Sequence, residues 1–308
     1  MRLKAGIFFV LLIGASLFAR SQTAADLALL EKRSDSLKIF AYAMVNDLDA
    51  DDRYKASMEL IPHLVNALKV PHSFHYPFDS LKEVSIVYPE DSSFRIFTWA
   101  FTPNDKMSYR FFGALQMNTR DGELKLFPLF DNSEYTRDLD TITNNKAWIG
   151  ALYYNIVTTK DKGKTYYTLF GWHGYNFRSN EKLLDVLTFD NGEPVFGAPI
   201  FNMSNTVTPG DTKNRLIFIY KRNGNLGLNY DPDRKIIIFD HLTSLIGKPE
   251  EKYTLVPDGT YEGFKWKHGY WMHISKVFHN VSKRPPFPAP INFGKDILEK
   301  EKIKQHDE

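Results

Sequence analysis

The chain has 308 residues, with 39 Lys and Arg residues, 37 Asp and Glu residues and no cysteine. The absence of cysteine excludes disulfides and thiolate metal sites, so the fold must be held together by its core alone. The nearly balanced charge supplies no basic footprint for a phosphate backbone, which argues against nucleic acid as a partner. The length is compatible with one large domain or two.

Residues 1–21 have the pattern of a secretory signal peptide. MRLK gives a basic start, AGIFFVLLIGASLF an apolar run, and Ala19-Arg20-Ser21 a small-x-small processing site. The apolar run has about fourteen residues, fewer than the roughly twenty that a membrane-spanning helix needs. We expect cleavage between Ser21 and Gln22, followed by a periplasmic or secreted location with no membrane span. Cleavage removes three basic residues and leaves 36 basic against 37 acidic residues.

Residues 22–71 are predicted to form a helical segment packed on the rest of the chain. Apolar residues recur every three or four positions in two runs, 27–48 and 54–68, which is typical of amphipathic helices. Thr23 and an aspartate between the two runs are the expected N-caps. Pro62 removes one helical N–H, so we expect a kink or a restart of the second helix there.

The acidic stretch between these helices resembles the first half of a calcium-binding loop. Asp47, Asp49 and Asp51 occupy the first, third and fifth positions of such a loop. Asp52 stands where the loop needs glycine, and Met58 where it needs a bidentate glutamate. We therefore interpret the stretch as an interhelical turn whose aspartates cap the second helix.

Residues 72–282 are predicted to form an antiparallel β domain. Between residues 84 and 275, aromatic and β-branched runs alternate with eight hairpin signals: PEDSS, TRDGE, TKDKGK, DNGEP, KRNGN, DPDR, PDGT and KHG. This spacing predicts a meander of about 12–14 strands, joined in sequence order. The similar segments FFGAL at 111–115 and WIGAL at 148–152 favour a propeller-like arrangement. A twisted sandwich or open barrel is the alternative.

Five segments carry a resemblance to a known family: SSFRIFTWAF, WIGALYYNIV, TYYTLFGWHGYN, KLLDVLTFDNGEPVFGAPIF and PHSFHYPFDSL. Together they look like an uncharacterised family of exported proteins from Bacteroidota, over roughly residues 25–275. The resemblance implies an exported, β-rich protein and brings no established activity. In that family the residue after the Gly-Trp pair is often acidic or amidic, whereas this chain has His173.

Residues 283–308 are predicted to form a proline-rich strap and a charged tail. The stiff segment KRPPFPAPINF is compatible with a strap across the protein's own surface, anchored by Phe287, Ile291 and Phe293. Docking into the aromatic groove of a partner is the alternative.

Catalytic motifs are scarce in the sequence. It contains no Gly-x-Ser-x-Gly elbow, no phosphate-binding glycine loop and no His-Glu-x-x-His helix. An exported hydrolase or lyase would instead need two carboxylates facing a cleft. The weak catalytic candidates are Asp131, His173 and Asp185, with Glu134 and Asp190 as further carboxylates.

Asp185 is the most unusual of these carboxylates, because it shares a strand face with apolar residues in LLDVLTF. A carboxylate in such surroundings either has a perturbed pKa or is paired. The structural interpretation is an ion pair, with Arg178 or Lys182 as partner.

Histidines give no metal motif. His268, His273 and His279 cluster near the end of the β region, but alternation along a strand places His268 and His273 on opposite faces. We therefore expect no metal site and no cofactor.

The segment LFGWHGYNF, residues 169–177, is the main candidate for a ligand-binding site. Its glycines allow the chain to bend out of a strand, and Trp172, His173, Tyr175 and Asn176 supply stacking and polar groups. Because aromatic residues make up 15% of the chain, some are expected at the surface. The preferred hypothesis is a non-catalytic binding module for a glycan, a peptide or an envelope protein. The alternative is an envelope hydrolase or lyase acting on a polysaccharide or peptidoglycan-like substrate.

Overall fold

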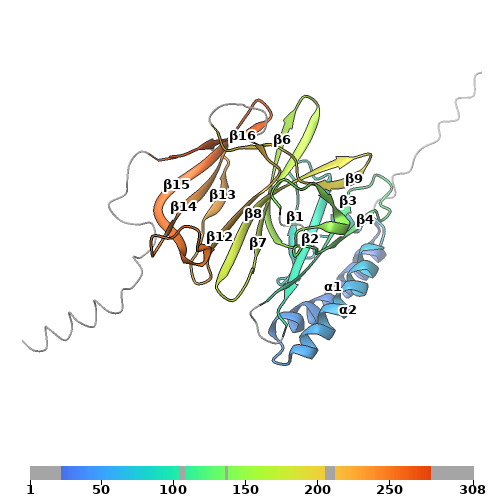
Figure 1. The fold of residues 1–308 in the computed structure, drawn as a ribbon. Helices are drawn as coiled ribbons and strands as arrows, with labels where there is room; N and C mark the ends of the chain where they lie inside the picture. The colour runs from blue at the N-terminus through green and yellow to red at the C-terminus, as the bar shows by residue number, and fades with distance from the viewer. Residues whose placement is uncertain (1–21, 104–107, 136–137, 205–211, 279–308) are drawn as a thin grey trace, which may run out of the picture.

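The computed structural model describes residues 22–103, 108–135, 138–204 and 212–278. In these residues two N-terminal helices are followed by sixteen strands in three sheets (Figure 1). The predicted mainly β, mostly antiparallel chain behind a helical hairpin is confirmed, and one sheet is curled into a half-barrel. The predicted signal peptide and proline-rich strap lie outside the described residues. None of the described helices is both long and apolar enough to cross a membrane.

The two helices begin at the predicted caps. Helix α1 (Ala24–Asn46) starts with a capping box in which Thr23 and Asp26 bond each other's backbone N–H. Helix α2 (Ala50–Leu68) is capped by Asp49, whose carboxylate accepts from the Asp51 N–H at 2.7 Å and the Asp52 N–H at 3.3 Å. Helix α2 is continuous through Pro62, so the predicted restart does not occur.

The first sheet is a four-stranded antiparallel meander that supports the helices. Along its second strand, Phe97 and Trp99 face the helices, while Phe94 and Ile96 face the second sheet. This alternation is the expected period of two. The strands are β1 (Ser85–Val87), β2 (Phe94–Phe101), β3 (Arg110–Met117) and β4 (Leu126–Phe130).

The second sheet lies at the centre of the molecule. One edge of its strand β8 pairs with β7, and the other edge is shared by β9 and β12. The strands are β5 (Thr143–Asn144), β6 (Leu152–Asp161), β7 (Lys164–His173), β8 (Ser179–Asp190), β9 (Glu193–Phe196) and β12 (Leu216–Lys221).

The third sheet has the order β11-β10-β16-β15-β14-β13. Strands β10 and β16 pair in parallel, whereas the other pairs in this sheet are antiparallel. The strands are β10 (Phe201–Asn202), β11 (Thr212–Lys213), β13 (Leu228–Asp231), β14 (Ile236–Ser244), β15 (Leu255–Lys267) and β16 (Tyr270–Ile274).

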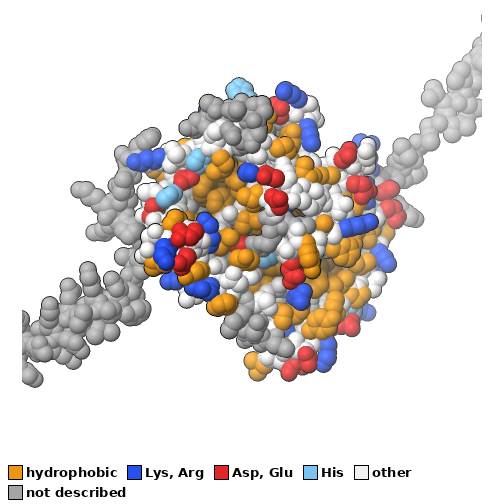
Figure 2. All heavy atoms as spheres, in the orientation of Figure 1, with side chains coloured by type: hydrophobic (Ala, Val, Ile, Leu, Met, Phe, Trp, Pro, Cys, Tyr) orange, Lys and Arg blue, Asp and Glu red, His pale blue; other side chains and the backbone are white. Residues whose placement is uncertain are grey.

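Helices and sheets therefore stack in four layers, as Figure 1 shows from right to left. The second sheet is buried on both faces, because Leu183 and Leu187 of β8 face the first sheet while Leu184 and Val186 face the third. Sheets of four, six and six strands are not copies of one propeller blade. Figure 2 shows acidic and basic side chains interspersed on the visible face, in keeping with the balanced composition.

Two of the eight predicted hairpin turns are wrong. KRNGN joins β12 to β13, which lie in different sheets. PDGT lies inside β15, where Asp258 bonds the Thr260 N–H and Gly259 has a φ of 87°. The β14–β15 register shifts here, between Asp240 and Leu242. The same residues suit a tight turn and a β-bulge, so only the pairing of the flanking strands distinguishes the two.

Candidate functional site

A cavity of about 430 Å³ opens where β3 begins and where β4 and β7 end. Three segments line it, residues 108–110, 131–135 and 173–175, and each contributes one tyrosine: Tyr109, Tyr135 and Tyr175. We call this cavity the tyrosine pocket. It brings together four of the residues singled out from the sequence, Asp131, Glu134, His173 and Tyr175, which come from two separate parts of the chain.

Asp131 is held at the pocket wall by one of its carboxylate oxygens. Its Oδ1 accepts from the Ser133 N–H at 3.0 Å, the Ser133 hydroxyl at 2.7 Å and the Gly150 N–H at 3.1 Å. A Cβ at Gly150 would lie only 2.5–2.7 Å from the carboxylate atoms, so glycine is required for this approach. Asp131 itself remains exposed, which leaves its carboxylate accessible from the cavity.

His173 contacts the other backbone polar group of Gly150, its carbonyl, which belongs to the following peptide group. Its Nδ1 lies 2.5 Å from the Gly150 carbonyl oxygen, and because a carbonyl only accepts, Nδ1 carries the proton. The imidazole stacks on Phe111 with ring centroids 4.5 Å apart, and His173 is only 7% exposed. Asp131 and His173 are thus fixed relative to each other through the backbone of Gly150.

Trp172 supports the pocket from behind. Its ring meets Tyr109 edge-on, with centroids 5.1 Å apart, and it does not line the cavity. Tyr109 covers Gly174 so closely that a Cβ there would overlap its ring. Trp172 packs behind the lining because alternation along β7 gives Trp172 and His173 different surroundings, and its ligand-binding role stays a prediction.

The connection from β7 to β8 forms the rim of the pocket. Tyr175 is 39% exposed on this rim, whereas Asn176 does not line the cavity. The Asn176 Oδ1 accepts from the backbone N–H groups of Arg178 at 2.8 Å and Ser179 at 2.9 Å. Asn176 thus closes the turn, as an Asx side chain often does.

Asp185 lies away from the tyrosine pocket, in the core between the sheets. Its Oδ1 is 3.2 Å from the Arg215 Nε, and both side chains are fully buried. Burial raises the pKa of Asp185, while Arg215 and the Val186 N–H oppose that shift. The pairing expected under the structural interpretation is present, but the partner is Arg215 rather than Arg178 or Lys182, because β12 pairs with the start of β8.

Sequence reasoning missed several parts of the site. Tyr109 and Arg110 line the pocket, but they lie at the start of β3 in a stretch without any recognised motif. Tyr135 directly follows the candidate Glu134 in DNSEY, so its presence beside two acids was the one available signal. The importance of Gly150 depends on a contact with Asp131, nineteen residues away in the chain.

Histidines elsewhere form hydrogen bonds between strands. His273 donates to Glu262 at 2.6 Å, and His241 contacts Asp258 at 2.7 Å across the β14–β15 bulge. In the part of the chain that the structure describes, no three His, Asp or Glu side chains are arranged to hold a metal ion. His279 lies outside the described residues.

Comparisons with known proteins do not indicate a function for this chain. The sequence matches no protein-family model, and searches of the curated proteins and of the solved structures returned no match. The proposed function is therefore based on the residues that line the tyrosine pocket.

Proposed function

We propose that the chain is a non-catalytic module that binds a short glycan in the tyrosine pocket. The observation that carries the proposal is the convergence of Tyr109, Tyr135 and Tyr175 with Asp131 and Glu134 on one cavity. A sugar ring offers apolar C–H faces that pack on aromatic rings and hydroxyl groups that donate to carboxylates. The lining supplies both kinds of group.

The size and rigidity of the pocket support a small ligand. Its volume of about 430 Å³ lies within the range of small-molecule sites, roughly 300–1,000 Å³. Asp131 and His173 are both fixed on the backbone of Gly150, and Tyr109 is fixed against Trp172. A preorganised lining loses little entropy on binding, which favours recognition of a flexible oligosaccharide.

The hydrogen bonds of the site favour binding over catalysis. Three protein donors hold the Asp131 Oδ1 in one position. His173 directs its Nδ1 proton to the Gly150 carbonyl, which fixes the orientation of the imidazole. These are properties of a fixed polar surface.

The same proposal includes an exported location. The pattern of residues 1–21 supports a periplasmic or secreted protein, for which envelope polysaccharides and envelope proteins are available partners. The balanced charge and the aromatic lining favour a neutral glycan over a polyanion within that set.

The experiment is a glycan-array screen of the secreted protein, followed by calorimetric titration with the neutral trisaccharides of glucose and N-acetylglucosamine. Replacing Tyr109 or Tyr175 by alanine should weaken binding about tenfold or more, because each removes a stacking surface. Tyr42→Ala on α1 is the matched control, since Tyr42 is 60% exposed and outside the pocket. Equal affinity in all three variants would refute the site assignment.

A second candidate, an envelope hydrolase or lyase, is favoured by one observation. Asp131, Glu134 and His173 line the same cavity and include two carboxylates and an imidazole. Asp185, paired with Arg215 in the core, is replaced by Glu134 in this version. Release of new reducing or unsaturated ends from polysaccharides, abolished by Glu134→Gln, would establish an enzyme in place of a binding module.

A further inference from the structure

The rim of the tyrosine pocket is a short, closed connection. Residues 174–178 join β7 to β8, and Tyr175 lies within them. The Asn176 N–H donates to the Ser179 carbonyl at 3.1 Å, while its side chain accepts from the N–H groups of Arg178 and Ser179. Because the connection is closed on itself, a displacement of Arg178 is transmitted to Tyr175.

Arg222, which follows β12, contacts both this rim and the pocket wall. Its N–H donates to the Arg178 carbonyl at 2.9 Å, and its Nη1 donates to the Asn176 carbonyl at 2.5 Å. Its guanidinium lies 6.0 Å from the centroid of the Tyr109 ring, at the outer limit of a cation–π contact. One side chain that does not line the pocket thus touches the rim and Tyr109.

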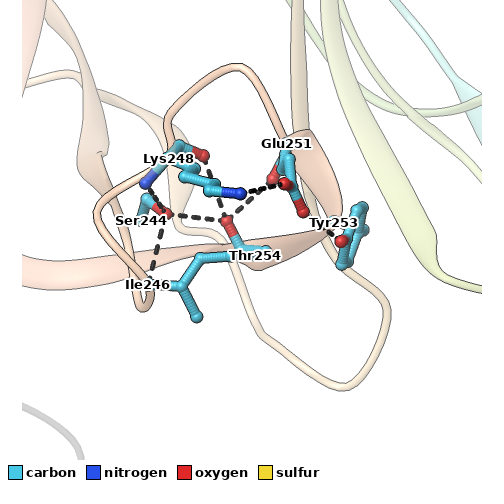
Figure 3. A network of polar contacts seen from close by, with 6 residues as sticks. All are labelled: Ser244, Ile246, Lys248, Glu251, Tyr253 and Thr254. Atoms are coloured by element: carbon cyan, nitrogen blue, oxygen red, sulfur yellow. Dashed lines mark hydrogen bonds and ion pairs between the residues drawn. The ribbon is translucent and has the colours of Figure 1, made fainter.

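Arg178 is held from the third sheet. Its guanidinium stacks on the Tyr253 ring, with Cζ 3.2 Å from the ring centroid. The Tyr253 hydroxyl donates to the Glu251 carboxylate, whose other oxygen lies 3.3 Å from the Lys248 Nζ (Figure 3). The ring that supports Arg178 is therefore fixed at its far end.

The loop carrying Tyr253 is itself closed by hydrogen bonds. The Ser244 and Thr254 hydroxyls are 2.8 Å apart across its base, and Ser244 accepts from the Lys248 N–H at 2.9 Å. Thr254 also donates to the Glu251 carbonyl at 2.7 Å. Figure 3 shows the contacts of this loop meeting at the Ser244 and Thr254 hydroxyls. We call residues 244–254 the supporting loop.

We propose that Arg178 and Arg222 are positioning residues for the tyrosine pocket, and that the supporting loop fixes the rim through the stacking of Tyr253 on Arg178. The inference rests on the proposed function, because it assigns these residues to the orientation of Tyr175 and Tyr109 for a bound ligand. The supporting loop is coupled to the pocket through direct contacts, from Tyr253 to Arg178 and from Arg178 to the connection that carries Tyr175. A stacked guanidinium sets both distance and angle, which a lysine at position 178 would not reproduce.

The first test requires no ligand. A 3-fluorotyrosine at position 175 reports the ring environment by ¹⁹F NMR in the secreted protein. Arg178→Ala should shift and broaden this resonance, whereas Arg234→Ala should leave it unchanged. Arg234 is the matched control because its guanidinium also lies over an aromatic ring, that of Phe278, but on the β13–β14 turn. An unchanged Tyr175 resonance in Arg178→Ala would overturn the positioning role, whether or not a glycan binds.

The second test uses the neutral trisaccharide selected in the binding screen. Arg178→Ala and Tyr253→Leu should each weaken its affinity about tenfold, and the double variant should be no weaker than either single variant. Additive losses, or full affinity in both single variants, would contradict the coupling. If no trisaccharide binds the unaltered protein, the proposed function fails while the fluorine signal still decides the positioning role.

Discussion

Replacement of Gly150 by alanine tests the geometry that links Asp131 to His173. The new methyl group would lie 2.5–2.7 Å from the Asp131 carboxylate atoms, whereas ordinary contacts begin near 3.4 Å. The carboxylate must therefore move by about 1 Å, which lengthens three hydrogen bonds of 2.7–3.1 Å beyond useful range. Because Asp131 is exposed, water can replace part of each hydrogen bond. We therefore expect the free energy of unfolding to fall by about 2 kcal/mol.

Urea denaturation of a double-mutant cycle is the assay. In an Asp131→Ala background the carboxylate is absent, so Gly150→Ala should cost only a few tenths of a kcal/mol. Glycan binding should fall in Gly150→Ala, because the displaced carboxylate no longer faces the cavity in the same orientation. If the two substitutions destabilise the protein additively, the close approach of Gly150 and Asp131 is not what constrains position 150.

Three further predictions concern the pocket wall, the core and the supporting loop. Gly174→Ala should displace the Tyr109 ring and weaken trisaccharide binding about tenfold, as measured by calorimetry, and unchanged affinity would contradict the packing of Tyr109 on Gly174. Asp185→Ala should lower the free energy of unfolding by about 3–5 kcal/mol, because it removes the carboxylate that faces the buried Arg215 guanidinium. In urea denaturation, the Asp185→Leu/Arg215→Met double variant should recover most of this loss, and no recovery would argue against an ion-pair origin. Hydrogen bonds from Tyr253 and then Lys248 hold the pKa of Glu251 below its ordinary value of 4.5. The contribution of this carboxylate to folding stability is therefore present above the pKa of the unfolded state, and it is lost as pH falls through the lowered pKa of the folded state. A ¹³C NMR titration should give a Glu251 midpoint below 4.5, and this midpoint should rise in Tyr253→Phe. A midpoint at or above 4.5 in the unaltered protein would contradict the contacts of Tyr253 and Lys248 with the Glu251 carboxylate that Figure 3 shows.

Local features of the fold were predictable because their causes are local. Thr23 and Asp49 cap their helices through side-chain bonds to N–H groups two or three residues away. The turn at Asn191 and Gly192 has positive φ at both residues, which the Asn-Gly pair favours. Each signal and its consequence lie within a few residues.

Features that depend on pairing between distant strands were not predictable. β12 joins β8 instead of its sequence neighbour β13, and this pairing places Arg215 beside Asp185. The turn-like PDGT became a bulge because both flanking segments belong to one long strand. The order of strands across three sheets is set by the burial of whole faces, which no short pattern encodes.

In the candidate site, too, local features were predictable from the sequence, whereas features that depend on distant segments were not. Composition and the bend at LFGWHGYNF pointed to His173 and Tyr175, and both residues line the tyrosine pocket. Trp172 and Asn176 belong to the same segment but do not line the pocket. Trp172 packs behind Tyr109 and Asn176 closes the turn, because residues on a strand and in a turn face different ways. Tyr109 reaches the pocket from a different sheet, which sequence proximity does not reveal.

The most direct test of the binding proposal is a ¹H–¹⁵N NMR titration of the purified protein with the selected neutral trisaccharide. We predict saturable shift changes concentrated in residues 108–110, 131–135 and 173–175, with none in α1 around Tyr42. Shift changes confined to another surface, or no change at millimolar trisaccharide, would contradict the assignment of the tyrosine pocket as a glycan-binding site.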